Sequence, residues 1–248
     1  MRRVTLVHGF LGSPADWADV LARLSPGIAC DCVPLTDLGC GSVDEAASML
    51  ALRLARNPCD LLVGYSMGGR IALELAAARG ELVPRLLLLG ASPGLDDAAE
   101  RARRASEDDA RAAEILRDGL DAFVERWYRL PIFAPFTRHP SFSAARLRRA
   151  QGEAAFWARC VAGCSPGRGT PRWSAIPAIA SRTVFAAGAL DERYAAYAAR
   201  ARDMSASSAR ALRTEIVAGA GHVLPLEAPD ACARLIESTL QLTPETTP

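Results

Sequence analysis

Short runs of apolar residues alternate along most of the chain with longer segments in which apolar residues recur at helical spacing. This alternation predicts the α/β class, with a mostly parallel β-sheet that helices cover on both faces. Six apolar runs predict strands at residues 4–7, 28–33, 60–64, 85–90, 182–188 and 212–217. The segments between them predict helices at about residues 14–24, 42–56, 70–78, 192–203 and 229–242.

Two of these helices begin at sequences typical of a helix N-terminus. Ser13 stands before Pro14 and three residues before Asp16, and Ser42 stands three residues before Glu45. A serine at such a position accepts a backbone N–H from the first helical turn. We therefore expect both serines to act as N-caps.

The pattern changes in the middle of the chain. The strand signal disappears there, and helical stretches rich in alanine, arginine and glutamate take its place, together with most of the large aromatic residues. We interpret residues 95–172 as a helical cap inserted into an α/β core that comprises residues 1–94 and 173–248. The last residues, 243–248, are expected to be frayed.

Composition excludes several classes of protein. Of the 248 residues, 50% are hydrophobic and 23% are charged, and the net charge is +1. These values exclude disordered and collagen-like chains, and also a nucleic-acid binder that works by bulk charge. All 29 basic side chains are arginine, because the sequence contains no lysine. Most of these arginines are expected to be surface charge, so only position can single out a functional one.

The seven cysteines show no spacing typical of a metal site or a disulfide framework. We expect buried thiols in a reducing, cytoplasmic protein, with no metal and no cofactor. No apolar run approaches the length of about 18 residues that a membrane span needs, and the N-terminus carries no signal-peptide cleavage site. The expected partner is a small molecule, with no nucleic acid and no membrane. The oligomeric state stays open, and a monomer is compatible with the sequence.

The segment Gly64-Tyr65-Ser66-Met67-Gly68 fits the pattern G-x-S-x-G and lies between a predicted strand and a predicted helix. At such a turn the serine occupies a strained backbone conformation, and small neighbours let the strand and the helix pass closely. The helix N-terminus beside the serine also favours developing negative charge. Ser66 is therefore the candidate reactive residue of an enzyme site.

A reactive serine needs a base, and the chain has three histidines, His8, His139 and His222. After a G-x-S-x-G turn, the acid and then the histidine follow the serine along the chain. This order selects His222, which lies in the loop after the last predicted strand. We expect His8 to shape the loop after the first strand and His139 to lie at the surface of the cap.

The remaining parts of the site follow from their places beside the predicted strands. Asp191 comes directly after the strand at residues 182–188 and is the first candidate for the acid that orients the histidine. Asp203, at the end of a predicted helix, is the second candidate. Two backbone N–H groups, those of Met67 and Phe10, are expected to stabilise an oxyanion.

With these residues in this order, the sequence resembles the α/β-hydrolase superfamily over essentially its whole length. The resemblance rests on His8-Gly9-Phe10, the Ser66 elbow, Asp191 and Gly221-His222. The chain departs from the usual pattern at residues 37–42, where relatives usually carry a histidine between glycines. That loop is usually structural in relatives, so we expect the catalytic set to be unaffected.

Arg70 lies one helical turn after Ser66, near the floor of the expected pocket. A buried arginine is costly unless an anion meets it. The residues alone leave two explanations open, a permanent carboxylate partner inside the protein or a carboxylate of the substrate.

Several segments narrow the resemblance to one family, the 2-succinyl-6-hydroxy-2,4-cyclohexadiene-1-carboxylate synthases of menaquinone biosynthesis. They are the elbow at residues 64–70, residues 92–95, and residues 99–104 and 127–133 in the predicted cap. The resemblance implies that Arg70, Arg104 and Arg148 hold a polyanionic substrate, that Tyr65 and Trp127 line its pocket, and that Arg101 is a further candidate contact.

The same resemblance implies elimination of pyruvate from 2-succinyl-5-enolpyruvyl-6-hydroxy-3-cyclohexene-1-carboxylate, a substrate with three carboxylates. Ser66, activated by His222 and Asp191, would remove the proton alpha to the succinyl carbonyl. The amides of Met67 and Phe10 would hold the resulting enolate. Two other functions stay open: a serine hydrolase that cleaves an ester, thioester or C–C bond, and a catalytically inactive binding protein.

Overall fold

The computed structural model describes residues 1–207 and 211–242. Residues 243–248, for which the sequence predicts fraying, lie outside the described residues, as do residues 208–210.

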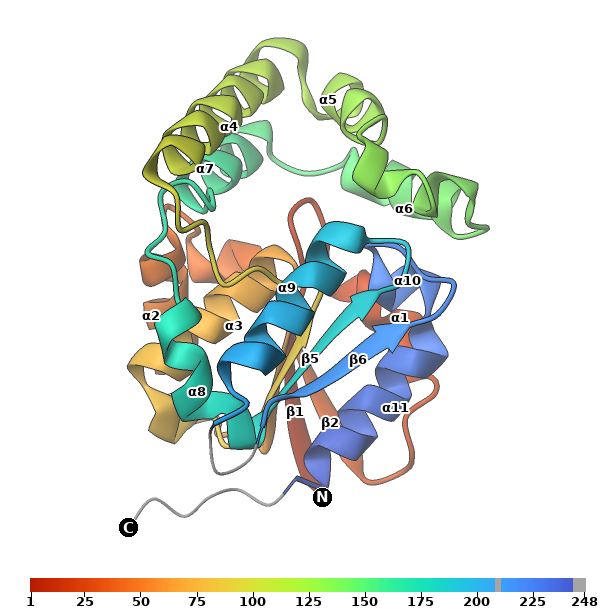
Figure 1. The fold of residues 1–248 in the computed structure, drawn as a ribbon. Helices are drawn as coiled ribbons and strands as arrows, with labels where there is room; N and C mark the ends of the chain where they lie inside the picture. Colours follow the sequence, from red (N-terminus) through yellow and green to blue (C-terminus); the bar gives the residue numbers. More distant parts are fainter. Residues whose placement is uncertain (208–210, 243–248) are drawn as a thin grey trace.

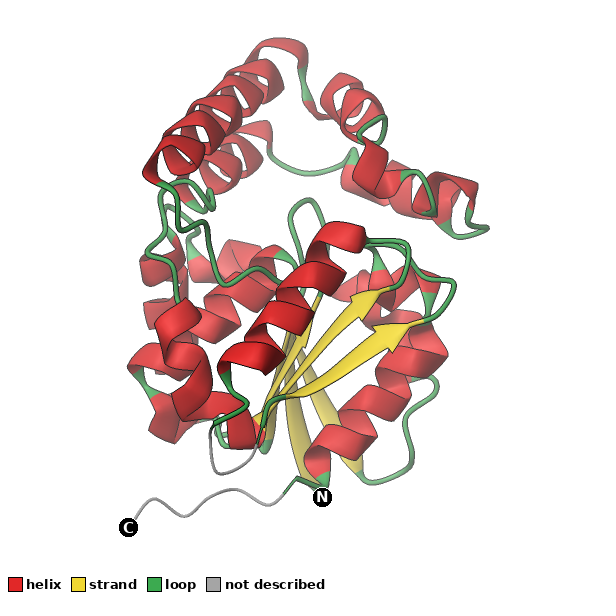
Figure 2. Ribbon diagram, viewed as in Figure 1, coloured by secondary structure: helices red, strands yellow, loops and turns green. Residues whose placement is uncertain are grey.

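Six parallel strands form one sheet in the order β2-β1-β3-β4-β5-β6, which is the yellow layer of Figure 2. The strands are β1 (Arg2–Val7), β2 (Ile28–Val33), β3 (Leu61–Tyr65), β4 (Leu86–Leu89), β5 (Thr183–Gly188) and β6 (Arg213–Val217). Each predicted strand is present to within two residues at either end, which confirms the α/β class. All pairings among the described strands are parallel.

Helices cover both faces of this sheet, with α1 and α11 on one face and α2, α3 and α9 on the other (Figure 1). Because the central strands β3 and β4 are covered on both sides, their sequences are apolar throughout and every residue in them is buried. The helices of this part are α1 (Ala18–Leu21), α2 (Val43–Arg56), α3 (Met67–Ala78), α8 (Ile176–Ile179), α9 (Glu192–Met204), α10 (Leu224–Glu227) and α11 (Pro229–Leu240).

The two predicted N-caps have different outcomes. Ser42 accepts a backbone N–H from the first turn of α2 at 3.0 Å, which confirms that cap. Ser13 makes no such bond, and the segment predicted as one helix at residues 14–24 is a 3₁₀ turn, Pro14–Trp17, followed by the short α1. Asp16, which was expected to strengthen this helix start, is instead buried in ion pairs with the cap.

Four further helices lie above the carboxyl ends of the strands, where the arrowheads of Figure 1 point. They are α4 (Ala98–Asp118), α5 (Leu120–Trp127), α6 (Phe142–Arg149) and α7 (Ala154–Gly163), all inside the segment predicted as an insertion. We call this layer the cap. Open α/β sheets bind their ligands at the carboxyl ends of the strands, so the cap and this edge of the sheet enclose the place to search for a site.

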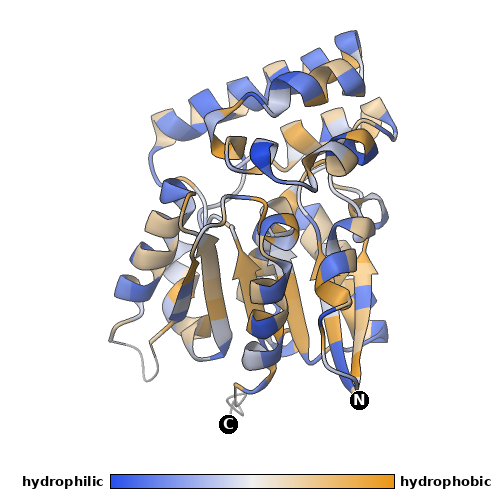
Figure 3. Ribbon diagram, turned by 90° about the vertical axis from the view of Figure 1, so that its right-hand side faces the viewer, coloured by the Kyte–Doolittle hydropathy of each residue, from blue (hydrophilic) through white to orange (hydrophobic). Residues whose placement is uncertain are grey.

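Apolar residues gather in the layer of strands and on the helix faces that turn toward it (Figure 3). The seven cysteines are free thiols; five of them are buried and two are half-buried, in keeping with the prediction that they pack as small apolar residues. Within the described residues, no helix is long and apolar enough to span a membrane.

Candidate active site

The turn between β3 and α3 has the strained geometry that the sequence predicts. Ser66 has a φ of 52° and a ψ of −112°, an unfavourable conformation for a residue with a side chain. A side chain at Gly68 would collide with the backbone carbonyl oxygens of Val7 and His8, and one at Gly64 would lie 2.6 Å from a backbone oxygen of the turn. The glycines therefore let α3 approach the sheet while the serine hydroxyl projects from the turn.

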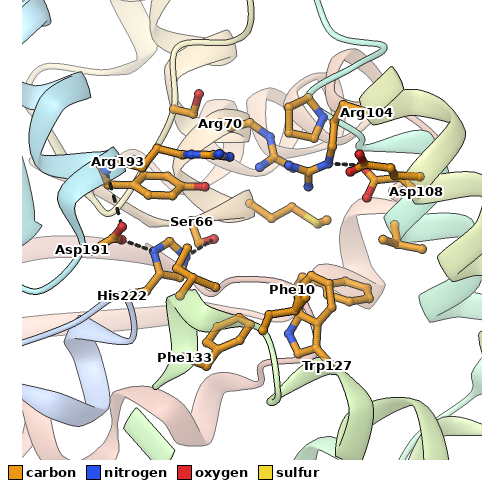
Figure 4. A pocket seen from close by; sticks show the side chains of 18 of the residues that line it. Phe10, Ser66, Arg70, Arg104, Asp108, Trp127, Phe133, Asp191, Arg193 and His222 are labelled. Atoms are coloured by element: carbon orange, nitrogen blue, oxygen red, sulfur yellow. Dashed lines mark hydrogen bonds and ion pairs between the residues drawn. The ribbon is translucent and has the colours of Figure 1, made fainter. Parts of the chain in front are cut away.

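Ser66, His222 and Asp191 form a continuous hydrogen-bonded set (Figure 4). The Asp191 Oδ2 lies 2.7 Å from His222 Nδ1, and His222 Nε2 lies 3.0 Å from Ser66 Oγ. Because a carboxylate only accepts, Nδ1 carries the proton of the neutral ring and Nε2 is free to accept from the serine. The side chains of His222 and Asp191 are 5% and 3% exposed, so water competes little for these bonds.

Neighbouring backbone groups hold both partners of the serine in place. Asp191 is the N-cap of α9, where the helix terminus favours a negative charge. Glu227, which the sequence analysis missed, accepts the backbone N–H groups of Gly221 and Val223, the two residues that flank His222. The histidine loop is therefore tied on both sides. The other candidate acid, Asp203, is exposed in the last turn of α9, where it pairs with Arg202.

Two unpartnered backbone N–H groups lie beside Ser66. The amides of Phe10 and Met67 donate to no acceptor among the described residues, and both residues line the pocket above the serine. The ring of Phe10 packs edge-on against Trp127 at 5.4 Å and against Trp157 at 5.5 Å, both in the cap. The backbone of Phe10 therefore belongs to a loop of the core, while its ring packs against side chains of the cap.

A pocket of about 690 Å³ separates the sheet edge from the cap. This volume suits a small organic molecule. Tyr65 and Trp127 both line it, as the family resemblance implies. Tyr65 is almost fully buried, and burial raises the pKa of its phenol well above the ordinary value, so this hydroxyl stays protonated.

Two arginines form a cationic end of this pocket. Arg70 donates from Nη2 to the carbonyl oxygen of Cys164 at 2.6 Å, its buried Nε has no partner, and it pairs with no carboxylate in the described part of the chain. Figure 4 shows Arg104 next to it. Burial, with the charge of Arg104 acting in the same direction, lowers the pKa of Arg70, although a guanidinium stays charged at neutral pH. Arg70 therefore places in the pocket a positive charge that forms no ion pair with a carboxylate of the described residues.

Comparison with known proteins identifies the family of this chain. A model of the alpha/beta hydrolase family matches residues 6–235. A Bacillus subtilis protein provisionally named 2-succinyl-6-hydroxy-2,4-cyclohexadiene-1-carboxylate synthase is 32% identical over 96% of this chain and 89% of its own length. The chain belongs to this synthase family of α/β-hydrolases.

Two further relatives carry related names. The Serratia proteamaculans 2-succinyl-6-hydroxy-2,4-cyclohexadiene-1-carboxylate synthase is 34% identical over 52% of this chain and 53% of its own length. The structure of MenH from S. aureus superposes with a TM-score of 0.86 and 24% identity, covering 97% of this chain and 93% of that one. This structural likeness concerns the fold.

Two of the arginines that the synthase resemblance implies lie elsewhere. Arg148 pairs with Asp16 at 3.2 Å, while Arg149, one residue later, lines the pocket and also pairs with Asp16 at 2.8 Å. One residue turns a helix by about 100°, so the run of arginines in α6 presents only one of them inward. Arg101 donates to two backbone carbonyl oxygens of the loop that leads into α4 and does not line the pocket.

The ion pairs of Asp16 with Arg148 and Arg149 link the core to the cap. Arg149 also donates to the hydroxyl of Tyr128, so both of its terminal nitrogens bind protein groups, while its buried Nε has no partner among the described residues. Against the effect of burial, Arg149 and Arg148 hold the pKa of Asp16 below its ordinary value.

Arg193 is one of several pocket-lining arginines that the sequence did not single out. Arg193 lies in the first turn of α9, is exposed, and lines the pocket without an ion-pair partner among the described side chains. Figure 4 shows it pointing into the pocket from the side of Asp191. The sequence offered one indication of this role, which is that Arg193 lies two residues after Asp191. However, a charged residue at the start of a helix is usually expected at the surface.

The other two histidines of this chain, His8 and His139, do not line the pocket. His8 accepts the backbone N–H of Leu35 at Nε2, 3.2 Å away, and donates from Nδ1 to Gly9 at 2.9 Å, so it shapes the loop after β1. Burial lowers the pKa of His8 to about 4, which keeps the ring neutral at pH 7. His139 lies half-buried in the cap, where its Nδ1 contacts the hydroxyl of Ser141 at 2.8 Å.

Metal-ligating side chains do not gather in this structure. No group of three or more histidine, cysteine, aspartate or glutamate side chains in residues 1–207 and 211–242 is arranged to hold a metal ion.

Proposed function

We propose that this chain eliminates pyruvate from 2-succinyl-5-enolpyruvyl-6-hydroxy-3-cyclohexene-1-carboxylate to give 2-succinyl-6-hydroxy-2,4-cyclohexadiene-1-carboxylate. One observation carries the proposal beyond family membership: Arg70, without an internal carboxylate, lies with Arg104 in the same pocket as the Ser66–His222–Asp191 set. Proton transfer and carboxylate binding can therefore act on one small molecule at the same time.

The proton-transfer step uses the hydrogen bonds around Ser66. His222 Nε2 takes the hydroxyl proton, and the serine oxygen removes the proton from C2 of the ring, alpha to the succinyl carbonyl. The electron pair of this C–H bond moves onto the carbonyl oxygen as an enolate, which the amides of Phe10 and Met67 stabilise. Loss of a single donor of this kind costs about 3 kcal/mol, or about a hundredfold in rate.

The elimination then follows from the positions of the double bonds. The enolate re-forms its carbonyl, C2 and C3 become doubly bonded, the ring double bond moves to C4 and C5, and the C5–O bond breaks. The enolpyruvyl group leaves as the enolate of pyruvate and takes up a proton. Atoms and electrons balance without a cofactor, and no covalent bond to Ser66 forms.

The three carboxylates of this substrate account for the cationic end of the pocket. Arg70 and Arg104 lie at one side of Ser66, and the unpaired Arg193 points in from the side of α9. A hydrogen bond between charged groups contributes about 1.5–3 kcal/mol, and a guanidinium fork matches the two oxygens of a carboxylate. We assign Arg70 and Arg104 to substrate carboxylates, with Arg193 as a third contact in the place where the resemblance had implied Arg148.

A serine hydrolase is the competing function, since the same set of serine, histidine and oxyanion donors suits ester cleavage. The purified chain is incubated with the cyclohexene substrate, and pyruvate is followed through lactate dehydrogenase, in parallel with p-nitrophenyl acetate and butyrate. We expect pyruvate release that depends on Ser66 and little ester turnover. Rapid ester turnover without pyruvate would contradict the proposal.

The seven free thiols also support the expected cytoplasmic location, because a reducing compartment keeps such thiols unpaired.

A further inference from the structure

We propose that Asp108 is a positioning residue, which holds Arg104 toward the substrate and Arg111 toward the aromatic wall of the pocket. The proposal rests on the proposed function, because it takes Arg104 as a ligand of a substrate carboxylate. It adds a residue that neither the sequence pattern nor the reaction chemistry singles out.

Asp108 is buried where its helix is otherwise polar. α4 has 21 residues, and only Asp108 and Ile115 among them are buried. The carboxylate is 1% exposed, whereas the side chain of the next residue, Asp109, is 52% exposed. A buried carboxylate is costly unless charged hydrogen bonds compensate it, so this position demands partners.

Each oxygen of this carboxylate binds a different arginine. Oδ2 accepts from Arg104 Nε at 2.8 Å, and Oδ1 accepts from Arg111 Nη1 at 2.5 Å. Both arginines belong to the same helix, one turn before and one turn after Asp108, and their side chains are 28% and 23% exposed. Asp108 therefore contacts two cations at the wall of the pocket, and Glu107 forms a second, longer ion pair with Arg111 at 3.6 Å.

The atoms used on Arg104 decide what it can still bind. Asp108 takes only Nε, so both terminal Nη groups remain without an acceptor among the described residues. They are the groups that form a two-pronged bond with a carboxylate. Since Arg70 lies beside them, an anion placed between the two arginines would meet a preset guanidinium and relieve the repulsion between like charges.

Arg111, the second arginine that Asp108 binds, contacts the aromatic wall of the pocket. The guanidinium carbon of Arg111 lies 5.6 Å from the centre of the Trp127 ring, a cation–π distance. Trp127 packs against Phe10, whose amide belongs to the proposed oxyanion hole. Asp108 thus joins α4 to the wall against which the substrate ring would pack.

Asp108→Asn tests this role, and Asp109→Asn is the matched control. Asp109 is the neighbouring residue on α4 and pairs with Arg168 at 2.7 Å outside the pocket. We expect KM of pyruvate release to rise about 10- to 100-fold in D108N, with kcat changed less than about threefold, because binding is lost and the proton-transfer groups are intact. D109N should match the unsubstituted enzyme.

Arg104→Ala supplies a readout that a merely structural role would not move. If Asp108 acts through Arg104, D108N adds less than about twofold to KM in the R104A background. An equal rise in both backgrounds would overturn the proposal, and so would an equal loss in D109N. Should D108N fail to fold, Asp108→Glu keeps the charge but displaces the arginines, and an unchanged KM in that variant would also overturn it.

A binding measurement separates this proposal from the proposed function. The probe is 2-(3-carboxypropanoyl)benzoate, a stable aromatic dicarboxylate, titrated by calorimetry into the unsubstituted enzyme and into D108N. Enzyme that binds the probe but releases no pyruvate contradicts the proposed function alone. Enzyme that releases pyruvate while D108N keeps its KM and its affinity for the probe contradicts the role of Asp108 alone.

Discussion

The two ends of the pocket differ in how far the protein completes them. At the catalytic end, Ser66, His222 and Asp191 bind one another at 3.0 and 2.7 Å, and backbone groups hold their loops. At the cationic end, Arg70 has a buried Nε without a partner, and Arg104 keeps both of its terminal nitrogens free. The proposed proton-transfer groups are therefore held in place by the protein, whereas the proposed recognition groups keep nitrogen atoms with which an anion could still bind.

The difference follows from where each end originates. The proposed catalytic residues lie directly after strands of one sheet, whose register fixes their spacing. The cationic end combines Arg70 from the elbow helix with Arg104 from the cap. Substitutions should therefore separate the two ends, with turnover lost at one and affinity lost at the other.

Ser66→Ala should break the catalytic end with the largest effect. Without the serine oxygen the α-proton has no positioned acceptor, and kcat of pyruvate release should fall about 10³-fold or more. Calorimetry with the dicarboxylate probe should give a Kd within about twofold of the unsubstituted enzyme, because Arg70 and Arg104 are untouched. A large loss of affinity would show that the two ends are not separable.

The pH dependence of the free energy of unfolding should test the loop after β1, which His8 shapes beneath the catalytic end. Burial holds the pKa of His8 at about 4, against an ordinary value of 6.5. Between these values the unfolded chain binds a proton that the folded chain rejects. The free energy of unfolding should therefore fall as the pH drops from 6.5 toward 4, by up to about 3 kcal/mol.

Urea unfolding at several pH values measures this effect. His8→Gln should remove most of the slope in that interval, since glutamine does not titrate. The control is His139→Gln, a substitution in the cap away from the pocket, which should retain the slope. Equal slopes in H8Q and in the unsubstituted protein would contradict the prediction.

Arg70→Lys should weaken substrate binding at the cationic end, with a smaller change in free energy than Ser66→Ala causes in the activation barrier. Lysine keeps the charge but replaces the guanidinium fork with a single ammonium, so KM should rise about 10- to 100-fold, corresponding to about 1.5–3 kcal/mol. Arg79→Lys, just beyond the end of α3, is the control, because Arg79 pairs with Glu81 at the surface. Equal kinetics for R70K and R79K would remove Arg70 from substrate recognition.

The sequence was most informative where chain order and backbone geometry constrain the residue. The strands follow from apolar runs that two layers of helices bury. Ser66, Asp191 and His222 could be selected because a parallel sheet brings the ends of its strands to one edge, and the structure brings all three together. Their catalytic roles stay predictions until the substitutions are measured.

The sequence was least informative where the turn of a helix determines which of several similar residues points inward. The arginines of α6 differ by single steps of about 100°, and the sequence did not reveal that Arg149 and not Arg148 faces the pocket. Asp108 looks like one of many charges on α4 until its burial is known. Asp16 resembles a residue that supports a helix start, but its partner lies more than 130 positions away.

Phe10 has a consequence for how this enzyme could be inhibited. Its amide is one of two donors beside Ser66, and its ring lies between Trp127 and Trp157 of the cap. A compound that binds between these rings would move the Phe10 side chain and, with it, the Phe10 amide. Such a compound would displace a proposed oxyanion donor without contacting the serine or the arginines, so the aromatic cluster is a separate target for inhibitor design.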